Sequence, residues 1–237
     1  MRILIVNDDS VTAPGIAVLA GAASRIGEVT VVAPAYQCSA MSQRLTIHDP
    51  MLLKRVNDFP APVAAAYSLV GTPVDCVKVA LQYILDEKPD WFFSGINNGY
   101  NVGHDIAYSG TLGAAFEAAR SGIPAIAFSS AGDKHLSALV PYLDAIIQQL
   151  LDTGAEEGTV WNVNFPPLAS KPLEGTLWDR SVARTSLYEE RYQGTPQADG
   201  SVLLNNVGVP VEEDRIGEGT DAEAVRNGFI SIGKVKA

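Results

Sequence analysis

The sequence predicts an α/β protein with a mostly parallel central sheet and a C-terminal β-hairpin arm. Short apolar, β-branched runs alternate with helix-forming stretches over the first two-thirds of the 237-residue chain. The first two runs are separated by a helix-forming stretch that closes on Gly27, which makes a βαβ unit and therefore a parallel strand pair. Beyond residue 167 the segments become polar and rich in turn residues, which is typical of a hairpin.

The elements of the core are predicted from local composition and from the residues that begin and end each segment. Short runs rich in β-branched and apolar residues predict strands at residues 2–6, 29–34, 64–70, 90–96, 123–129 and 160–166. Helix formers between them predict helices at residues 14–27, 71–85, 109–122 and 136–154, the last with Pro141 near its first turn. Thr72, Pro73 and Asp75 give the second helix a capping box with proline in its first turn. Ser109 or Thr111 opens the third helix.

The C-terminal region has three predicted elements. A hairpin runs from about Thr185 to Asn206, with its turn near Asp199 and Gly200. A short helix capped by Thr220 and a terminal strand at residues 229–235 follow. We therefore expect a catalytic core over residues 1–167 and a second region over residues 168–237 that serves oligomerisation, because a lone two-stranded hairpin is marginally stable in water.

Composition narrows the class of partner and compartment. The formal net charge of −10 offers no basic stripe, so binding to nucleic acid is not expected. No run approaches the roughly 18 apolar residues of a membrane span, and the N-terminus lacks a signal-peptide layout, so we expect a cytoplasmic protein without membrane contact. In that compartment Cys38 and Cys76 are expected to be free thiols.

Polar side chains collect where three of the predicted strands end. They are Asn7, Asp8, Asp9 and Ser10 after the first strand, Cys38, Ser39 and Ser42 after the second, and Asn97, Asn98 and Asn101 after the strand at 90–96. Ligands of open parallel sheets bind beyond the carboxyl ends of the strands, where the strand order reverses. Hard oxygen donors of this kind suit Mg²⁺ or Mn²⁺.

Each of these loops has a plainer interpretation when it is taken alone. Adjacent acids are more often a solvated turn, serines often make local backbone hydrogen bonds, and Asn and Gly favour turns. Taken together the loops favour one site, because a single sheet edge would otherwise collect three unrelated polar segments.

The stretch YSGT, residues 108–111, adds a candidate phosphate site. Small residues at a helix start leave backbone N–H groups and the positive end of the helix dipole free for an anion, with the hydroxyls of Ser109 and Thr111 beside them. An ordinary helix cap would have the same residues. Neither GxGxxG nor GxxxxGK[ST] occurs, so dinucleotide and P-loop sites lose their main support.

A phosphoacceptor receiver domain would also begin with a hydrophobic strand and an acid pair. It needs a further aspartate after its third strand and a lysine after its fifth. The loops here offer Ser39 and Asn97 instead, and the strand IPAIAFSS ends without lysine, so this alternative is disfavoured.

The combination of motifs resembles the SurE family of stationary-phase survival proteins. The matching stretches are RILIVNDD, APGI, VVAP with the serine loop that follows it, GTPVDCV, SGINNGYNVG, YSGTLGAAFEA and the late GTD, in order over positions 2–221. The resemblance implies a Rossmann-like core and a metal-dependent nucleotidase that hydrolyses nucleoside 5′- and 3′-monophosphates. Some family members also remove terminal phosphate from polyphosphate. The resemblance further implies one divalent cation per subunit, bound at the positions of Asp8, Asp9, Ser39 and Asn97.

The expected chemistry assigns a role to each candidate residue. Asp8 or Asp9 orients or deprotonates the attacking water, or Asp8 acts as a nucleophile that forms an aspartyl phosphate. The expected phosphate-binding residues are Ser42, Asn101, Ser109, Gly110 and Thr111. His104 is read as a solvated loop residue beside Asp105 rather than a leaving-group acid. A homodimer or homotetramer is expected, and the alternative function is a nucleotide-binding regulatory module without turnover.

Overall fold

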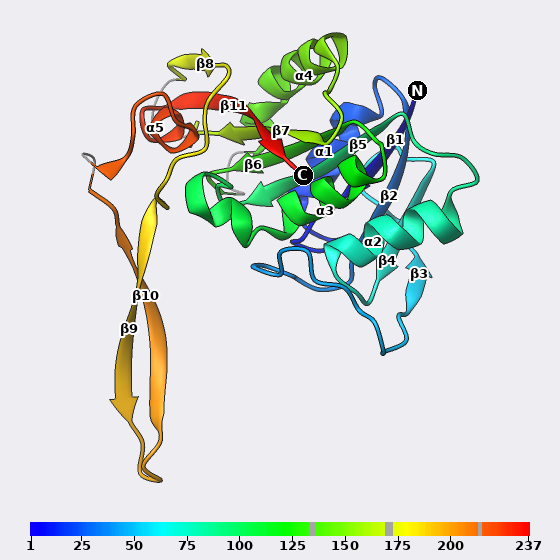
Figure 1. The fold of residues 1–237 in the computed structure, drawn as a ribbon. Coiled ribbons are helices and arrows are strands. Elements are labelled where there is room, and N and C mark those ends of the chain that lie inside the picture. The colour runs from blue at the N-terminus through cyan, green and yellow to red at the C-terminus, as the bar shows by residue number, and fades with distance from the viewer. Residues whose placement is uncertain (133–135, 169–172, 213–214) are drawn as a thin grey trace.

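The computed structural model describes residues 1–132, 136–168, 173–212 and 215–237. Over these residues the chain forms a nine-stranded sheet with helices on both faces and a separate two-stranded hairpin that projects from this body (Figure 1). The predicted fold class is confirmed.

The strand order places the candidate loops at the switch point of the sheet. The order is β3-β4-β2-β1-β5-β6-β7-β11-β8, with β1 paired in parallel to both β2 and β5. The chain moves to one side of β1 through β2 and β4, and to the other side through β5, β6 and β7. The strands are β1 (Arg2–Val6), β2 (Glu28–Pro34), β3 (Leu53–Arg55), β4 (Ala65–Leu69), β5 (Trp91–Asn98), β6 (Ala125–Ser130), β7 (Thr159–Phe165), β8 (Gly175–Leu177) and β11 (Phe229–Lys236).

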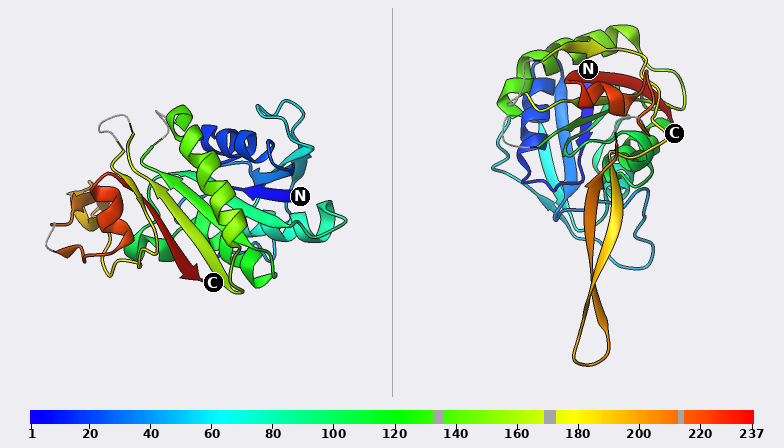
Figure 2. Two further views of the ribbon diagram at one scale, coloured as in Figure 1. Left: turned by 90° about the horizontal axis from the view of Figure 1, so that it is seen from above. Right: turned by 90° about the vertical axis from the view of Figure 1, so that its left-hand side faces the viewer.

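The alternation of apolar residues along each strand sends side chains to both faces of the sheet. Ile3 and Ile5 join the cluster covered by α1 (Pro14–Ala23) and α4 (Leu136–Thr153). Leu4 and Val6 join the opposite cluster, covered by α2 (Pro73–Val79) and α3 (Gly110–Arg120). Figure 2 shows the two helical layers enclosing the sheet.

Helix starts follow the predicted caps more closely than helix interiors do. The hydroxyl of Thr72 accepts a hydrogen bond from the N–H of Asp75, and the Asp75 carboxylate accepts one from the N–H of Thr72, which confirms the capping box. Ser109 rather than Thr111 caps α3, since its hydroxyl accepts from the N–H of Leu112 at 3.1 Å.

Two predicted helix interiors differ from the structure. The helix predicted to run without interruption to residue 85 ends as an α-helix at Val79 and continues as a π-helix, η1 (Ala80–Ile84). Pro141 lies inside α4, beyond the first turn of the described helix.

The C-terminal region is built into the body as well as extending from it. The hairpin consists of β9 (Tyr188–Pro196) and β10 (Val202–Pro210), with its turn at Asp199 and Gly200 as predicted. The terminal strand β11 pairs with β7 and β8. The sheet therefore contains strands from both sides of the expected boundary at residue 167.

The base of the hairpin is anchored by a small apolar cluster and one buried acid. The cluster joins Val102, Ala183, Val211, Ile216, Ala222 and Val225. Asp221, the first residue of α5 (Asp221–Arg226), accepts hydrogen bonds from the N–H groups of Gly103, Ala183 and Ala222 at 2.8–3.1 Å. Gly103 begins the 3₁₀-helix η2 (Gly103–Ala107), so this acid joins the hairpin base to the loop that follows β5.

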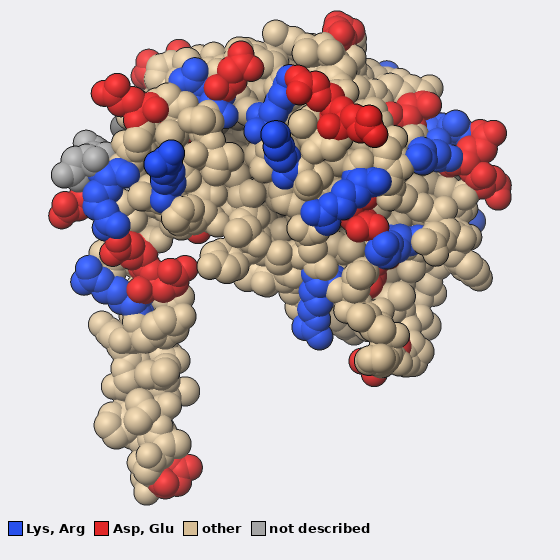
Figure 3. Space-filling model, in the orientation of Figure 1, with Lys and Arg blue, Asp and Glu red and all other residues tan. Residues whose placement is uncertain are grey.

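The two cysteines are free thiols, as predicted. Cys38 and Cys76 are also both buried. Every helix in the described ranges is too short or too polar to cross a bilayer. On the face drawn in Figure 3, Lys and Arg side chains lie among Asp and Glu side chains over the body.

Candidate functional site

The acid pair lies at the carboxyl end of β1, where three segments meet. Asp8 is buried, its carbonyl accepts the N–H of Cys38 at 2.7 Å, and its carboxylate accepts the hydroxyl of Thr111 at 2.8 Å. Burial raises the pKa of the Asp8 carboxyl to about 6, the Thr111 hydrogen bond opposes this shift, and the charge of Asp9 adds to it. Asp9 is partly exposed and accepts the N–H of Asn98 at 2.9 Å.

The first turn of α3 is packed directly on Asp8. A Cβ added at Gly110 would lie 3.0 Å from both the Cβ and the Oδ2 of Asp8, so a larger residue there would require Asp8 or the helix to shift. The first N–H groups of a helix have no intrahelical partner, and the helix dipole makes this end positive. The positive end of α3 therefore lies against the acid pair.

The loop after β5 is fixed by a network of asparagines. The N–H of Asn101 donates to the Asn164 side chain at 2.8 Å, and the Asn101 carbonyl accepts from the amides of Asn162 and Asn164. The Asn101 amide donates to the Ser129 hydroxyl at 2.8 Å. Asn97 donates its amide to the carbonyl of Gly99, which leaves its side-chain oxygen for another partner.

These strand ends enclose a cavity of about 640 Å³. Its lining residues are Asp8, Ser39, Ala40, Asn97, Asn98, Asn101, Asp105, Tyr108, Ser109, Glu190, Tyr192 and Asn206. The structure thus brings five of the sequence-predicted site residues into one cavity. Asp9 is tied to this wall through Asn98, and Gln37 bridges Asp9 and Ser39 at 3.5 and 3.0 Å.

The remaining predicted residues lie behind or beside the cavity wall. Thr111 and Gly110 contact Asp8 from within the protein. Ser42 donates its hydroxyl to the carbonyl of Ala107 at 2.9 Å, and its N–H donates to the carbonyl of Tyr108, so it closes the loop. His104 is exposed and is not among the cavity-lining residues.

Sequence reasoning missed the second half of this cavity. Asp105, Tyr108, Glu190, Tyr192 and Asn206 line it from η2 and from the hairpin. Asp105 lines the cavity, and burial is the main reason that its pKa is raised, while the neighbouring His104 opposes this shift. The two hairpin strands carry no motif that would have linked them to an acid pair more than 180 residues earlier.

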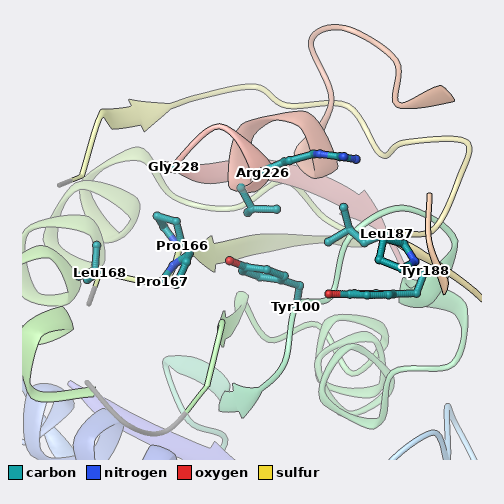
Figure 4. A pocket seen from close by; sticks show the side chains of 10 residues that line it. Tyr100, Pro166, Pro167, Leu168, Leu187, Tyr188, Arg226 and Gly228 are labelled. Carbon is teal, nitrogen blue, oxygen red and sulfur yellow. The ribbon is translucent and has the colours of Figure 1, made fainter. Parts of the chain in front are cut away.

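A second cavity, of about 340 Å³, lies at the hairpin base (Figure 4). It is lined mainly by apolar residues, and the hydroxyl of Tyr100 points toward Pro166 and Pro167. Burial raises the pKa of the Tyr100 phenol far above its ordinary value, so this group stays neutral. Among the described residues that line it there is no carboxylate, so the chemistry of the acid pair belongs to the larger cavity.

The donor set at the acid pair fits a hard divalent cation. Asp8, Asp9, Ser39 and Asn97 offer carboxylate, hydroxyl and amide oxygens, the ligands that Mg²⁺ and Mn²⁺ prefer. Asp8 is a buried carboxylate with a second carboxylate beside it, an arrangement that a cation would stabilise. Over the described residues there is no cluster of three His, Cys, Asp or Glu side chains, so a thiolate- or imidazole-rich site is not formed there.

Comparison with known proteins identifies the relatives of this chain. The family model described as survival protein SurE matches residues 3–189. Two relatives named 5′-nucleotidase SurE are 39% identical, from Flavobacterium psychrophilum, and 38% identical, from Geobacter sulfurreducens. The alignments cover 97% and 98% of this chain, and 89% and 86% of the relatives. The crystal structure of the SurE protein from Aquifex aeolicus superposes with a TM-score of 0.84 at 34% identity, covering 100% of this chain and 93% of that one.

Proposed function

This chain belongs to the SurE family, and we propose that it is a metal-dependent 5′-nucleotidase that hydrolyses nucleoside monophosphates. The name shared by its relatives, 5′-nucleotidase, supports the reaction class. The observation that carries the proposal is the convergence of Asp8, Ser39, Asn97, Asn101 and Ser109 on one cavity at the switch point of the sheet.

The cation would be held by Asp8, Asp9, Ser39 and Asn97. When bound, it would neutralise phosphate oxygens and lower the pKa of water. Thr111 and Gly110 act on this set indirectly, because both contact Asp8 and fix its carboxylate. Gln37 does the same for Asp9 and Ser39.

The phosphate would be held where α3 begins. Ser109 and Asn101 line the cavity, and the N–H groups of the first helical turn and the positive end of α3 favour an anion there. Ser42 supports this region through its bonds to Ala107 and Tyr108. Developing negative charge in the transition state would be stabilised by these fixed donors.

The proton chemistry falls to the acid pair. Asp9, partly exposed and fixed by the N–H of Asn98, is placed to orient or deprotonate the attacking water. Asp8 is the nucleophile in the alternative route, in which its carboxylate attacks phosphorus, the nucleoside leaves, and water then hydrolyses the aspartyl phosphate. Hydrolysis of 3′-monophosphates and of terminal phosphates in polyphosphate are further activities that we propose for the same site.

The test is phosphate release from a panel of nucleoside 5′- and 3′-monophosphates and from polyphosphate. We expect release with Mn²⁺ or Mg²⁺ and none after chelation with EDTA, with recovery when the cation is restored. Binding of adenosine 5′-monophosphate without phosphate release under any cation would instead support a regulatory module without turnover.

A further inference from the structure

The hairpin turns one of its faces toward the candidate active site. In the register of β9 and β10, Tyr192 is directly paired with Asn206, and side chains of paired residues share a face. Glu190 lies two residues before Tyr192 and therefore on the same face. All three line the cavity that contains Asp8, so the hairpin of the same chain forms one wall of the site.

Two tyrosines from separate elements line this cavity. Tyr108 follows η2 and is 60% exposed, and Tyr192 lies on β9 and is 67% exposed. A large aromatic side chain left open in a cavity gives up the free energy that its burial would provide. A flat ligand that covers the rings would recover this free energy, since every nucleobase has a π-face that stacks on tyrosine.

The charges of the cavity fix the direction in which a nucleotide would lie. Asp105 and Glu190 line the part built by η2 and the hairpin, and they interact electrostatically. Where the structure describes the cavity lining, it includes no Lys or Arg, so a phosphate group would be repelled from these two carboxylates. It is accepted at the other end, where α3 begins and the proposed cation binds. The uncharged nucleoside is then left for the hairpin end.

The smaller cavity is a poorer candidate for the nucleobase. Tyr100 lines that cavity and Asn101 lines the larger one, so the segment joining them separates the two. Asp8 lines the larger cavity together with Tyr108 and Tyr192, whereas the smaller cavity is not lined by Asp8. The base therefore belongs in the cavity that Asp8 lines.

We propose that Tyr108 and Tyr192 bind the nucleobase of the substrate by stacking, which makes the hairpin the nucleoside-binding wall of the site. This inference rests on the proposed nucleotidase function. Tyr108 and Tyr192 would set the preference for nucleotides over small phosphate esters without a base.

The test compares adenosine 5′-monophosphate with ribose 5-phosphate, which lacks the base. Stacking of one base contributes about 1–3 kcal/mol, which corresponds to a factor of about 5 to 150. We expect Tyr192→Ala and Tyr108→Ala to lower the ratio of kcat/KM for the two substrates by that factor, mainly through KM for the nucleotide. Tyr192→Phe keeps the aromatic ring and should keep the ratio.

A matched control on the hairpin is Val207→Ala. Val207 pairs with Arg191 on the opposite face and does not line the cavity, so its removal should leave the ratio at the parent value. Thermal melting and light scattering of each variant check folding and assembly. An unchanged ratio in Tyr192→Ala, or equal losses on both substrates, would overturn the inference.

A binding measurement separates this inference from the proposed reaction. Calorimetric titration of the Asp9→Asn protein with the same two compounds, with and without Tyr192→Ala, needs no turnover. One outcome is that the double variant loses nucleotide binding and the parent protein releases no phosphate. This result would support the nucleobase site and contradict the nucleotidase function. A parent that hydrolyses nucleotides while Tyr192→Ala binds them equally well would keep the nucleotidase and reject the nucleobase site.

Discussion

Asp8 joins three separate segments through its backbone carbonyl and its side chain. Its carbonyl accepts the N–H of Cys38, its carboxylate accepts the Thr111 hydroxyl, and Gly110 packs against it. A carboxylate held from several sides has few conformations to lose when a ligand binds, so it is preorganised. Asp9 has more exposure and fewer contacts, which suits a group that must meet water.

At the residue scale, we expect Asp8→Asn and Asp9→Asn to lower nucleotidase activity on the order of 100-fold or more. Each change keeps the side-chain size and removes a negative charge that would hold a divalent cation. Ser39→Ala and Asn97→Ala should weaken the cation more than they damage the fold. The measurement is phosphate release titrated with Mn²⁺, run beside thermal melting.

Exposed acids elsewhere provide a matched control for the loss of one charge. Asp199→Asn changes a carboxylate in the hairpin turn and should keep the parent activity and Mn²⁺ dependence. If Asp9→Asn hydrolyses nucleotides at the parent rate with unchanged Mn²⁺ dependence, the acid pair is only a turn and the proposed chemistry is wrong.

The part of the candidate site that lies at strand ends could be predicted from the sequence. Asp8, Asn97 and Ser39 could be placed together because parallel strands end on one edge of the sheet. The positions of Tyr192 and Asn206 could not be predicted, since they depend on how a distant hairpin leaves the body. The sequence predicts that Thr111 binds phosphate, and the structure adds that its hydroxyl donates to the Asp8 carboxylate, a contact that only side-chain geometry provides.

At the element scale, two glycines let helix α3 pack closely against the segments that form the candidate site. Gly110 lets the helix start approach Asp8, and one turn later Gly113 contacts the loop that carries Ser39 and Ser42. A Cβ at Gly113 would lie 2.1 Å from the carbonyl oxygen of Ser42, which no real contact permits. The close packing of α3 therefore sets the position of the loop.

We expect Gly113→Ala to destabilise the protein by about 1–3 kcal/mol, as overpacking does, and to weaken Mn²⁺ binding by displacing the Ser39 loop. Gly21→Ala is the matched control, because Gly21 lies in α1 with nothing within 4 Å of an added Cβ. It should stabilise by about 0.5–1 kcal/mol. Thermal melting with a parallel Mn²⁺ titration measures both, and equal effects of the two changes would contradict this account.

Local signals explain which elements were predicted well. The caps at Thr72 and Ser109 depend on residues three positions apart, so the sequence carries them directly. The change from α2 to η1 leaves no comparable mark, and the three-residue strands β3 and β8 are too short to show a period. Both strands form at sheet edges because tertiary packing brings them there.

At the scale of the whole molecule, the body and the hairpin differ in how they are stabilised. The body encloses its core between two helical layers, whereas the outer hairpin is a two-stranded sheet that stands away from it (Figures 1 and 2). Between its base and tip, the hairpin surface drawn in Figure 3 is largely uncharged. On β10, Val202, Leu203 and Leu204 are 55–62% exposed.

This hairpin therefore leads to a prediction about assembly. Leu203 and Leu204 are neighbours on one strand, so they point to opposite faces, and packing on the body of the same chain cannot cover both. We propose that a second subunit covers them in a homodimer or homotetramer.

We expect Leu203→Glu combined with Leu204→Glu to lower the molar mass measured by light scattering at micromolar concentration. Thermal melting should show that the body remains folded, because these residues lie outside its core. Ile47→Glu places a charge on an even more exposed apolar residue of the body and should leave the mass unchanged. A parent protein that is purely monomeric under these conditions would contradict the proposed assembly. It would not contradict the nucleobase site, because Tyr192 lines the cavity of its own chain.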